Sequence, residues 1–99
     1  MSTVNRISGP STSDVVYKAS FNGLDSLTVP GRPIHVDAQG PNIENHCVWY
    51  LLGGDKHGHH DVLIVGTGHY FESDGWVHVN SFLEDEGRLV WHAFCKRIS

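Results

Sequence analysis

The sequence predicts an all-β domain: a single small antiparallel sandwich or partly open barrel of six to seven strands. Apolar and polar residues alternate with a period of two in several segments, the pattern of a strand with one buried face. Clusters of Gly, Pro, Asn and Asp separate these segments and indicate turns. No segment of useful length has apolar residues at helical spacing, and the connections are too short for crossover helices.

The chain divides into an arm and one domain. Residues 1–13 are rich in Ser, Thr, Asn, Gly and Pro, and they predict a flexible N-terminal arm. Residues 14–99 predict a single β domain, a size at which one modest core forms. Alternation in residues 15–21 predicts a half-buried first strand, which the Asn22-Gly23 turn ends.

The next three segments differ in their burial pattern. Leu27 and Val29 predict a short strand, which prolines and a glycine at residues 30–33 interrupt. Residues 34–38 predict the clearest one-faced strand, with Ile34, Val36 and Ala38 inward, and a Gly-Pro-Asn cluster at residues 40–42 closes it. The continuous apolar run in residues 46–52 predicts a central strand that is buried on both faces.

The second half of the chain alternates loops and strands. Residues 53–60 form a Gly- and His-rich loop, and residues 61–65 predict a strand that Gly66-Thr67-Gly68 ends. Residues 69–75 predict an irregular connection with at most one helical turn, followed by a strand over residues 76–83. Residues 85–87 predict a hairpin turn with Gly87 in the left-handed region. Residues 88–97 predict the last strand.

Composition excludes several functions. A formal net charge of −4 argues against a nonspecific nucleic-acid binder, which needs a basic face. No apolar run reaches the roughly 18 residues of a membrane helix, and no export signal is visible. Cys47 and Cys95 indicate free, inert thiols in apolar runs, with a disulfide as the alternative if their strands are neighbours.

Two motifs stand out, GTGH at residues 66–69 and VWHAF at residues 90–94. With them, a fixed order of short strand segments resembles a family of small phage-encoded proteins, a domain of unknown function found in tailed phages and prophages. The segments are Val16-Tyr17-Lys18, Val29-Pro30, Ile34-His35-Val36 and Val48-Trp49. The resemblance covers residues 15–95, and the N-terminal arm and the loop at residues 57–60 depart from the pattern. It implies a phage origin and a place in the cytoplasm of the infected bacterial host, and it implies no activity.

The binding candidates gather around the two motifs. They are Thr67, His69, Tyr70, Trp76 and His92. Backbone amides of a glycine-rich turn can hold an anion, and Trp76 and Tyr70 offer stacking surfaces. The alternative is a tight turn that needs positive φ angles. We expect Trp49 and Trp91 in the core and leave Trp76 open.

No catalytic residues are predicted, because no nucleophile has a visible base. His57, His59 and His60 are weak metal candidates, since a site needs further ligands such as Asp61, His69 or His78. Adventitious binding by a surface loop is the simpler interpretation, and we expect no cofactor.

Together these features predict a small phage accessory protein that acts as a non-catalytic binding module and inhibits a host protein, in host takeover or in counter-defence of the anti-CRISPR type. One alternative is a sponge for a small nucleotide-type immune signal, and a second is a His-rich metal-dependent hydrolase. We expect a homodimer, with the N-terminal arm and the final strand at the sheet edges. We expect no membrane partner and no nucleic-acid partner.

Overall fold

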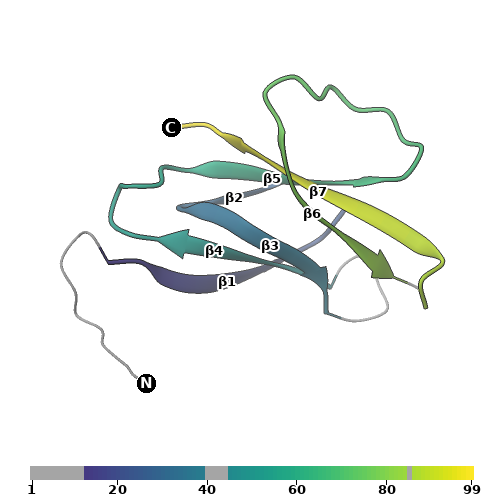
Figure 1. Ribbon diagram of the computed structural model, residues 1–99, viewed down its shortest axis with the longest axis horizontal. Coiled ribbons are helices and arrows are strands. Elements are labelled where there is room, and N and C mark those ends of the chain that lie inside the picture. The colour runs from purple at the N-terminus through teal and green to yellow at the C-terminus, as the bar shows by residue number, and fades with distance from the viewer. Residues whose placement is uncertain (1–12, 40–44, 85) are drawn as a thin grey trace.

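Strands are the only regular secondary structure in residues 13–39, 45–84 and 86–99, the parts described by this computed structural model (Figure 1). Seven strands follow one another: β1 Val15–Phe21, β2 Leu27–Val29, β3 Arg32–Ala38, β4 His46–Leu52, β5 His60–Gly66, β6 Val77–Glu84 and β7 Leu89–Arg97. The described residues contain no helix long and apolar enough to cross a membrane. The predicted arm, apart from Ser13, and the predicted turn at residues 40–42 lie outside these residues.

The strands form two antiparallel sheets that pack face to face (Figure 1). The three-stranded sheet has the order β1-β4-β3, and the four-stranded sheet has the order β2-β5-β7-β6. The fold is therefore the predicted all-β sandwich, and it is not closed into a barrel. The final strand, expected at an edge, instead lies between β5 and β6. That expectation was wrong because position in the chain does not fix position in a sheet.

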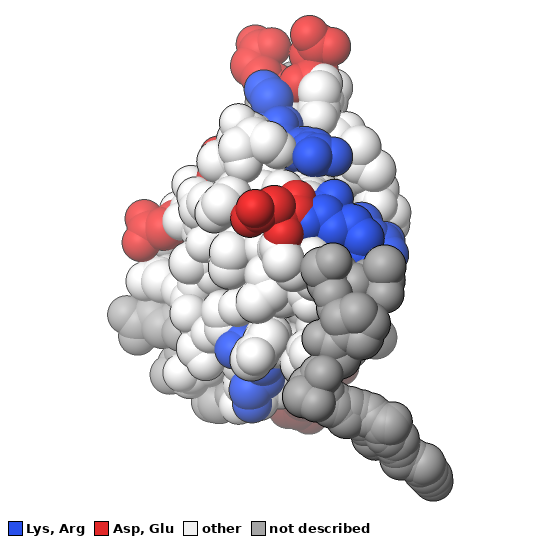
Figure 2. All heavy atoms as spheres, turned by 90° about the vertical axis from the view of Figure 1, so that its left-hand side faces the viewer, with Lys and Arg blue, Asp and Glu red and all other residues white. Residues whose placement is uncertain are grey.

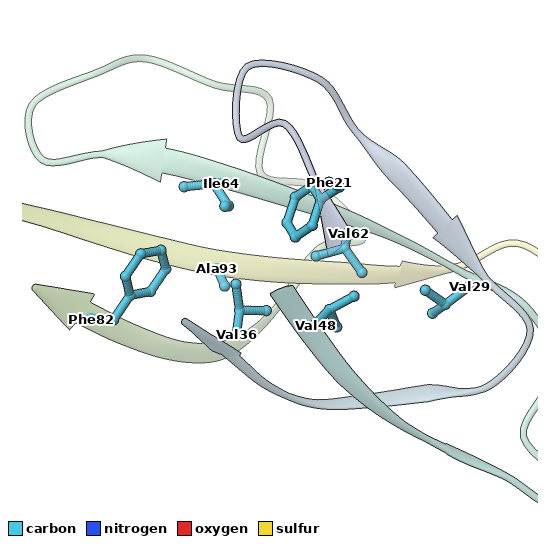
Figure 3. Packing of buried hydrophobic residues seen from close by; sticks show 8 residues of the cluster. All are labelled: Phe21, Val29, Val36, Val48, Val62, Ile64, Phe82 and Ala93. Atoms are coloured by element: carbon cyan, nitrogen blue, oxygen red, sulfur yellow. The ribbon is translucent and has the colours of Figure 1, made fainter. Parts of the chain in front are cut away.

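The core consists of inward-facing residues from both sheets (Figure 3). Val36 and Val48 lie opposite each other on β3 and β4, and both are fully buried. Val62 on β5 and Ala93 on β7 belong to the same core cluster and come from the four-stranded sheet. Burying each valine side chain stabilises the fold by about 1.5–3 kcal/mol. The remaining cluster members are Phe21, Val29, Ile64 and Phe82.

A bulge in β3 overturns the expected position of Ile34. Pro33 pairs with Tyr50 and His35 pairs with Trp49, so Ile34 is an extra residue between two paired positions. Its side chain is 39% exposed, whereas Pro33 takes the buried place. A second bulge lies between His78 and Asn80 on β6. One inserted residue reverses the alternation before it, which the sequence pattern does not reveal.

Two strands are less buried than expected. In β1, the residues from Val15 to Tyr17 are exposed and burial is complete only at Phe21. Tyr17 stacks on Tyr50 of its own sheet, with ring centroids 6.1 Å apart. The central strand β4 is fully buried only from His46 to Val48, and its second half is partly exposed.

Polar side chains link the two sheets at one edge. The amide of Asn80 on β6 bonds the backbone of Val36 on β3. Deeper inside, His46 Nε2 lies 3.3 Å from Glu84 Oε1, and both side chains are buried. The rings of Phe21 and Phe82 lie beside His46. Two aromatic rings thus lie beside the ionisable pair of His46 and Glu84, which joins the two sheets.

Glycine conformations confirm two predicted turns. Gly68 has a φ of 89° directly after β5, and Gly87 has a φ of 84° between β6 and β7. Residues 69–75 form an irregular connection without a helical turn. His60, expected in the preceding loop, is instead the first residue of β5 and is buried.

Candidate binding surfaces

A chain of polar side chains crosses the outer face of the four-stranded sheet. His92 on β7 is at its centre, with Nε2 2.8 Å from Thr67 Oγ1 and Nδ1 2.7 Å from Ser81 Oγ. Ser81 Oγ also lies 3.1 Å from His78 Nε2. The alternation of β6 and β7 places His78, Ser81 and His92 on this face. Both nitrogens of His92 are therefore engaged, which fixes the ring orientation.

The Ser81 hydroxyl lies between the imidazoles of His78 and His92, an arrangement that the sequence pattern did not predict. Ser81 and His92 are cross-strand partners, and only the strand register reveals that. A nucleophilic serine also needs its histidine oriented by a third group, usually a carboxylate. Within the described residues, no carboxylate hydrogen-bonds His78 or His92. The hydrogen bond between Ser81 and His92 fixes the orientation of both side chains on this face.

The GTGH turn surrounds a small hollow of about 300 Å³, which Thr67, His69, Arg88 and Trp91 line with Gly66, Leu89 and Val90. The turn amides are used internally, because Thr67 N donates to Val90 O and His69 N donates to Gly66 O. The expected anion cradle is therefore largely occupied by the protein's own carbonyls.

The other predicted binding residues do not join this hollow. Tyr70 is fully exposed. The Trp76 ring lies under Lys96, whose Nζ is 5.8 Å from the ring centroid. Of the five candidates, the structure brings together Thr67, His69 and His92 around one turn and leaves Tyr70 and Trp76 outside the hollow.

The three histidines proposed as weak metal candidates have separate surroundings. His57 Nε2 lies 2.9 Å from Asp14 Oδ1, and hydrogen bonds from His57 and Lys56 hold the pKa of Asp14 below its usual value. His59 Nδ1 lies 3.0 Å from Ser99 Oγ, and His60 is on β5. In the described part of the chain, no three His, Cys, Asp or Glu side chains gather around one point.

Trp49, expected in the core, lies on the outer face of the three-stranded sheet. Val48 points inward, so its neighbour Trp49 points outward and is only partly buried. His35 lies 5.5 Å from the ring on one side, and Lys18 Nζ lies 6.0 Å from it on the other. With Val16 and Leu51 these residues form what we call the Trp49 face. The continuous apolar run of residues 46–52 has no alternation that would reveal this outward position.

Trp91, by contrast, packs against the core as expected. The two cysteines are free and buried, Cys47 on the three-stranded sheet and Cys95 on the four-stranded sheet. Burial raises the pKa of the Cys95 thiol, so this side chain is a weak nucleophile at neutral pH.

A groove of about 640 Å³ lies between the starts of β3 and β6. Arg32, Lys96 and Arg97 supply its charged lining, and no Asp or Glu lines it. The sequence did not indicate this site, because Arg32 on β3 is far along the chain from Lys96 and Arg97 on β7. Figure 2 shows one face of the molecule, on which small groups of Lys and Arg lie among acidic residues and uncharged residues cover most of the area.

Comparison with known proteins gives a family and nothing more specific. A family model described as "Domain of unknown function (DUF7352)" matches residues 13–98. No curated protein and no solved structure matches the chain.

Proposed function

Since the chain belongs to the DUF7352 family, whose description assigns no activity, we propose a function from the geometry: the domain is a non-catalytic module that binds another protein through the Trp49 face. The carrying observation is the outward position of Trp49 on a sheet whose other face is the core. A tryptophan in that position is the residue type most enriched at binding hot spots.

The composition of this face fits a protein partner. Val16, Trp49 and Leu51 give apolar area, and Lys18 and His35 add polar groups at its sides. Aromatic residues are enriched at protein interfaces, whose apolar centre is surrounded by a polar rim.

The partner that we propose is a bacterial host protein. The GTGH and VWHAF motifs support this through their resemblance to a phage-encoded family. The domain would act in the cytoplasm of the infected host and block a host protein, such as a component of bacterial immunity. Blocking by occlusion needs a rigid scaffold and no reactive centre.

The two alternative functions have less support. A nucleotide sponge built on the GTGH turn would use Tyr70 and Trp76, which do not line the hollow there. A metal-dependent hydrolase built on His57, His59 and His60 would need these residues to converge, and each has different neighbours.

A matched pair of variants tests the proposal in pull-downs from bacterial lysate. Trp49→Ser removes the proposed anchor, and Leu83→Ser removes an apolar side chain that is 61% exposed on β6. We expect the wild type and Leu83→Ser to retain the same stoichiometric protein, identified by mass spectrometry, and Trp49→Ser to lose it. Equal recovery by both variants, or no stoichiometric protein with the wild type, would contradict the proposal.

A further inference from the structure

The groove lies between the starts of β3 and β6, and each of these strands has a bulge there. Asn80 on β6 hydrogen-bonds Val36 on β3 just past the lining residues of both strands. The bulges at Ile34 and Val79 lie on the two walls of the groove. Bulges often lie beside binding sites, where they redirect side chains and end strand pairing.

The charges of the groove have one sign. Arg32, Lys96 and Arg97 are exposed and line it, and its lining includes no acidic residue. The protein as a whole is acidic, with a formal net charge of −4. A concentration of cations in a concave site of an acidic protein favours an anionic ligand at that site.

A buried histidine, His60, is among the residues that line the groove. Its side chain is 8% exposed. Burial, together with the charges of Arg97 and Arg32, lowers the pKa of His60, so the ring is neutral at pH 7. A neutral His60 leaves the charge of the groove lining to Arg32, Lys96 and Arg97.

Most of the remaining lining is apolar, and Gly75 and His78 complete it. Pro33, Ile34, Val77 and Val79 line the walls, and Cys95 lines the space with them. The Lys96 ammonium lies over the ring of Trp76, which is not itself a lining residue, in a cation–π contact. A volume of about 640 Å³ is in the range of small-molecule sites.

We propose that this groove binds a small organic phosphate, with the phosphate near Arg32, Lys96 and Arg97 and an apolar or planar group against the walls. The proposal uses neither Trp49 nor its neighbours on β1, so either proposal can fail without the other. Guanidinium groups suit phosphate because they donate in a planar fork.

Calorimetric titration of the full chain with ADP and with inorganic phosphate tests the site. We expect ADP to bind, and inorganic phosphate to bind at least tenfold more weakly because it lacks the group that contacts the walls. Arg32→Gln and Lys96→Gln should each weaken ADP binding about tenfold. Lys18→Gln removes the same charge from the Trp49 face and should leave binding within twofold.

Melting temperatures show whether the variants fold, and the exposed positions of Arg32 and Lys96 favour intact folding. Four results would overturn the proposal: no ADP binding by the wild type, equal affinity for ADP and inorganic phosphate, unchanged ADP binding in both folded groove variants, or equal loss in Lys18→Gln.

Discussion

The side-chain amide of Asn80 bonds both backbone groups of Val36, with Oδ1 2.8 Å from Val36 N and Nδ2 2.9 Å from Val36 O. The Asn80 side chain thus makes the two hydrogen bonds that the backbone of a neighbouring strand would otherwise make with Val36. It satisfies the backbone of β3 at an edge where the two sheets meet, just past the residues that line the groove.

Replacing Asn80 should therefore lower the stability of the fold more than is usual for a residue near the surface. Asn80→Asp keeps one acceptor but loses the donor to Val36 O and places a carboxylate beside that carbonyl. We expect the free energy of unfolding to fall by about 1–3 kcal/mol, measured by urea denaturation. Asn22→Asp is the matched control, because Asn22 uses only its Oδ1 to accept from Leu24 N, and that bond survives the change. Similar losses in the two variants would contradict the role assigned to Asn80.

Two glycines near the core should respond differently to alanine. A Cβ at Gly31 would collide with the main-chain carbonyl of Leu51, which cannot move without distorting β4. A Cβ at Gly66 would meet Trp91 Cζ3 at 3.0 Å and the His69 ring at 3.1 Å, and these side chains can shift. We expect Gly31→Ala to destabilise by about 3 kcal/mol or more and Gly66→Ala by about 1 kcal/mol. Urea denaturation of the two variants measures this difference, and the reverse order would be inconsistent with the packing.

His60 should make stability depend on pH. Its pKa is lowered from 6.5 in the folded protein, so the unfolded chain binds more protons as the pH falls through 6.5. The stabilisation is thus present above 6.5 and is lost as the pH falls toward the lowered pKa. We expect the stability difference between the wild type and His60→Gln to shrink from about pH 7.5 to about pH 5.5. A difference that is constant over this range would show that His60 titrates normally.

We also predict a homodimer, which forms through β1. This strand is at a sheet edge, and Val15, Val16 and Tyr17 on it are 48–53% exposed. Edge strands with exposed apolar residues tend to pair with another chain. Light scattering after size exclusion should give a dimer for the wild type and a monomer for Val15→Lys with Tyr17→Lys. A monomeric wild type at high micromolar concentration would refute the prediction.

Alternation was sufficient to place the strands but not to orient all of their faces. It located β1 and β7 to within a residue, because period-two patterns and turn residues are local signals. It failed at Ile34, where a bulge inserts one residue, and at Trp49, where an apolar run conceals which residues point outward. It also could not show that β7 is an interior strand, since strand order depends on distant contacts.

The same limit applies to the candidate sites. The GTGH motif indicated the Thr67 and His69 hollow because its residues are neighbours in the chain. The His92–Ser81 pair depends on strand register, and the groove unites Arg32 with Lys96 from separate sheets. No local pattern connects such residues.

The affinity of the captured host protein for the wild type and for Trp49→Ala tests the central claim most directly. Calorimetric titration should show binding that is weaker by about 30-fold or more in Trp49→Ala, the loss typical of a hot-spot tryptophan. The melting temperature of the variant should stay close to that of the wild type, because Trp49 is outside the core cluster. Equal affinities for a folded Trp49→Ala variant and the wild type would contradict the claim that this face binds the partner.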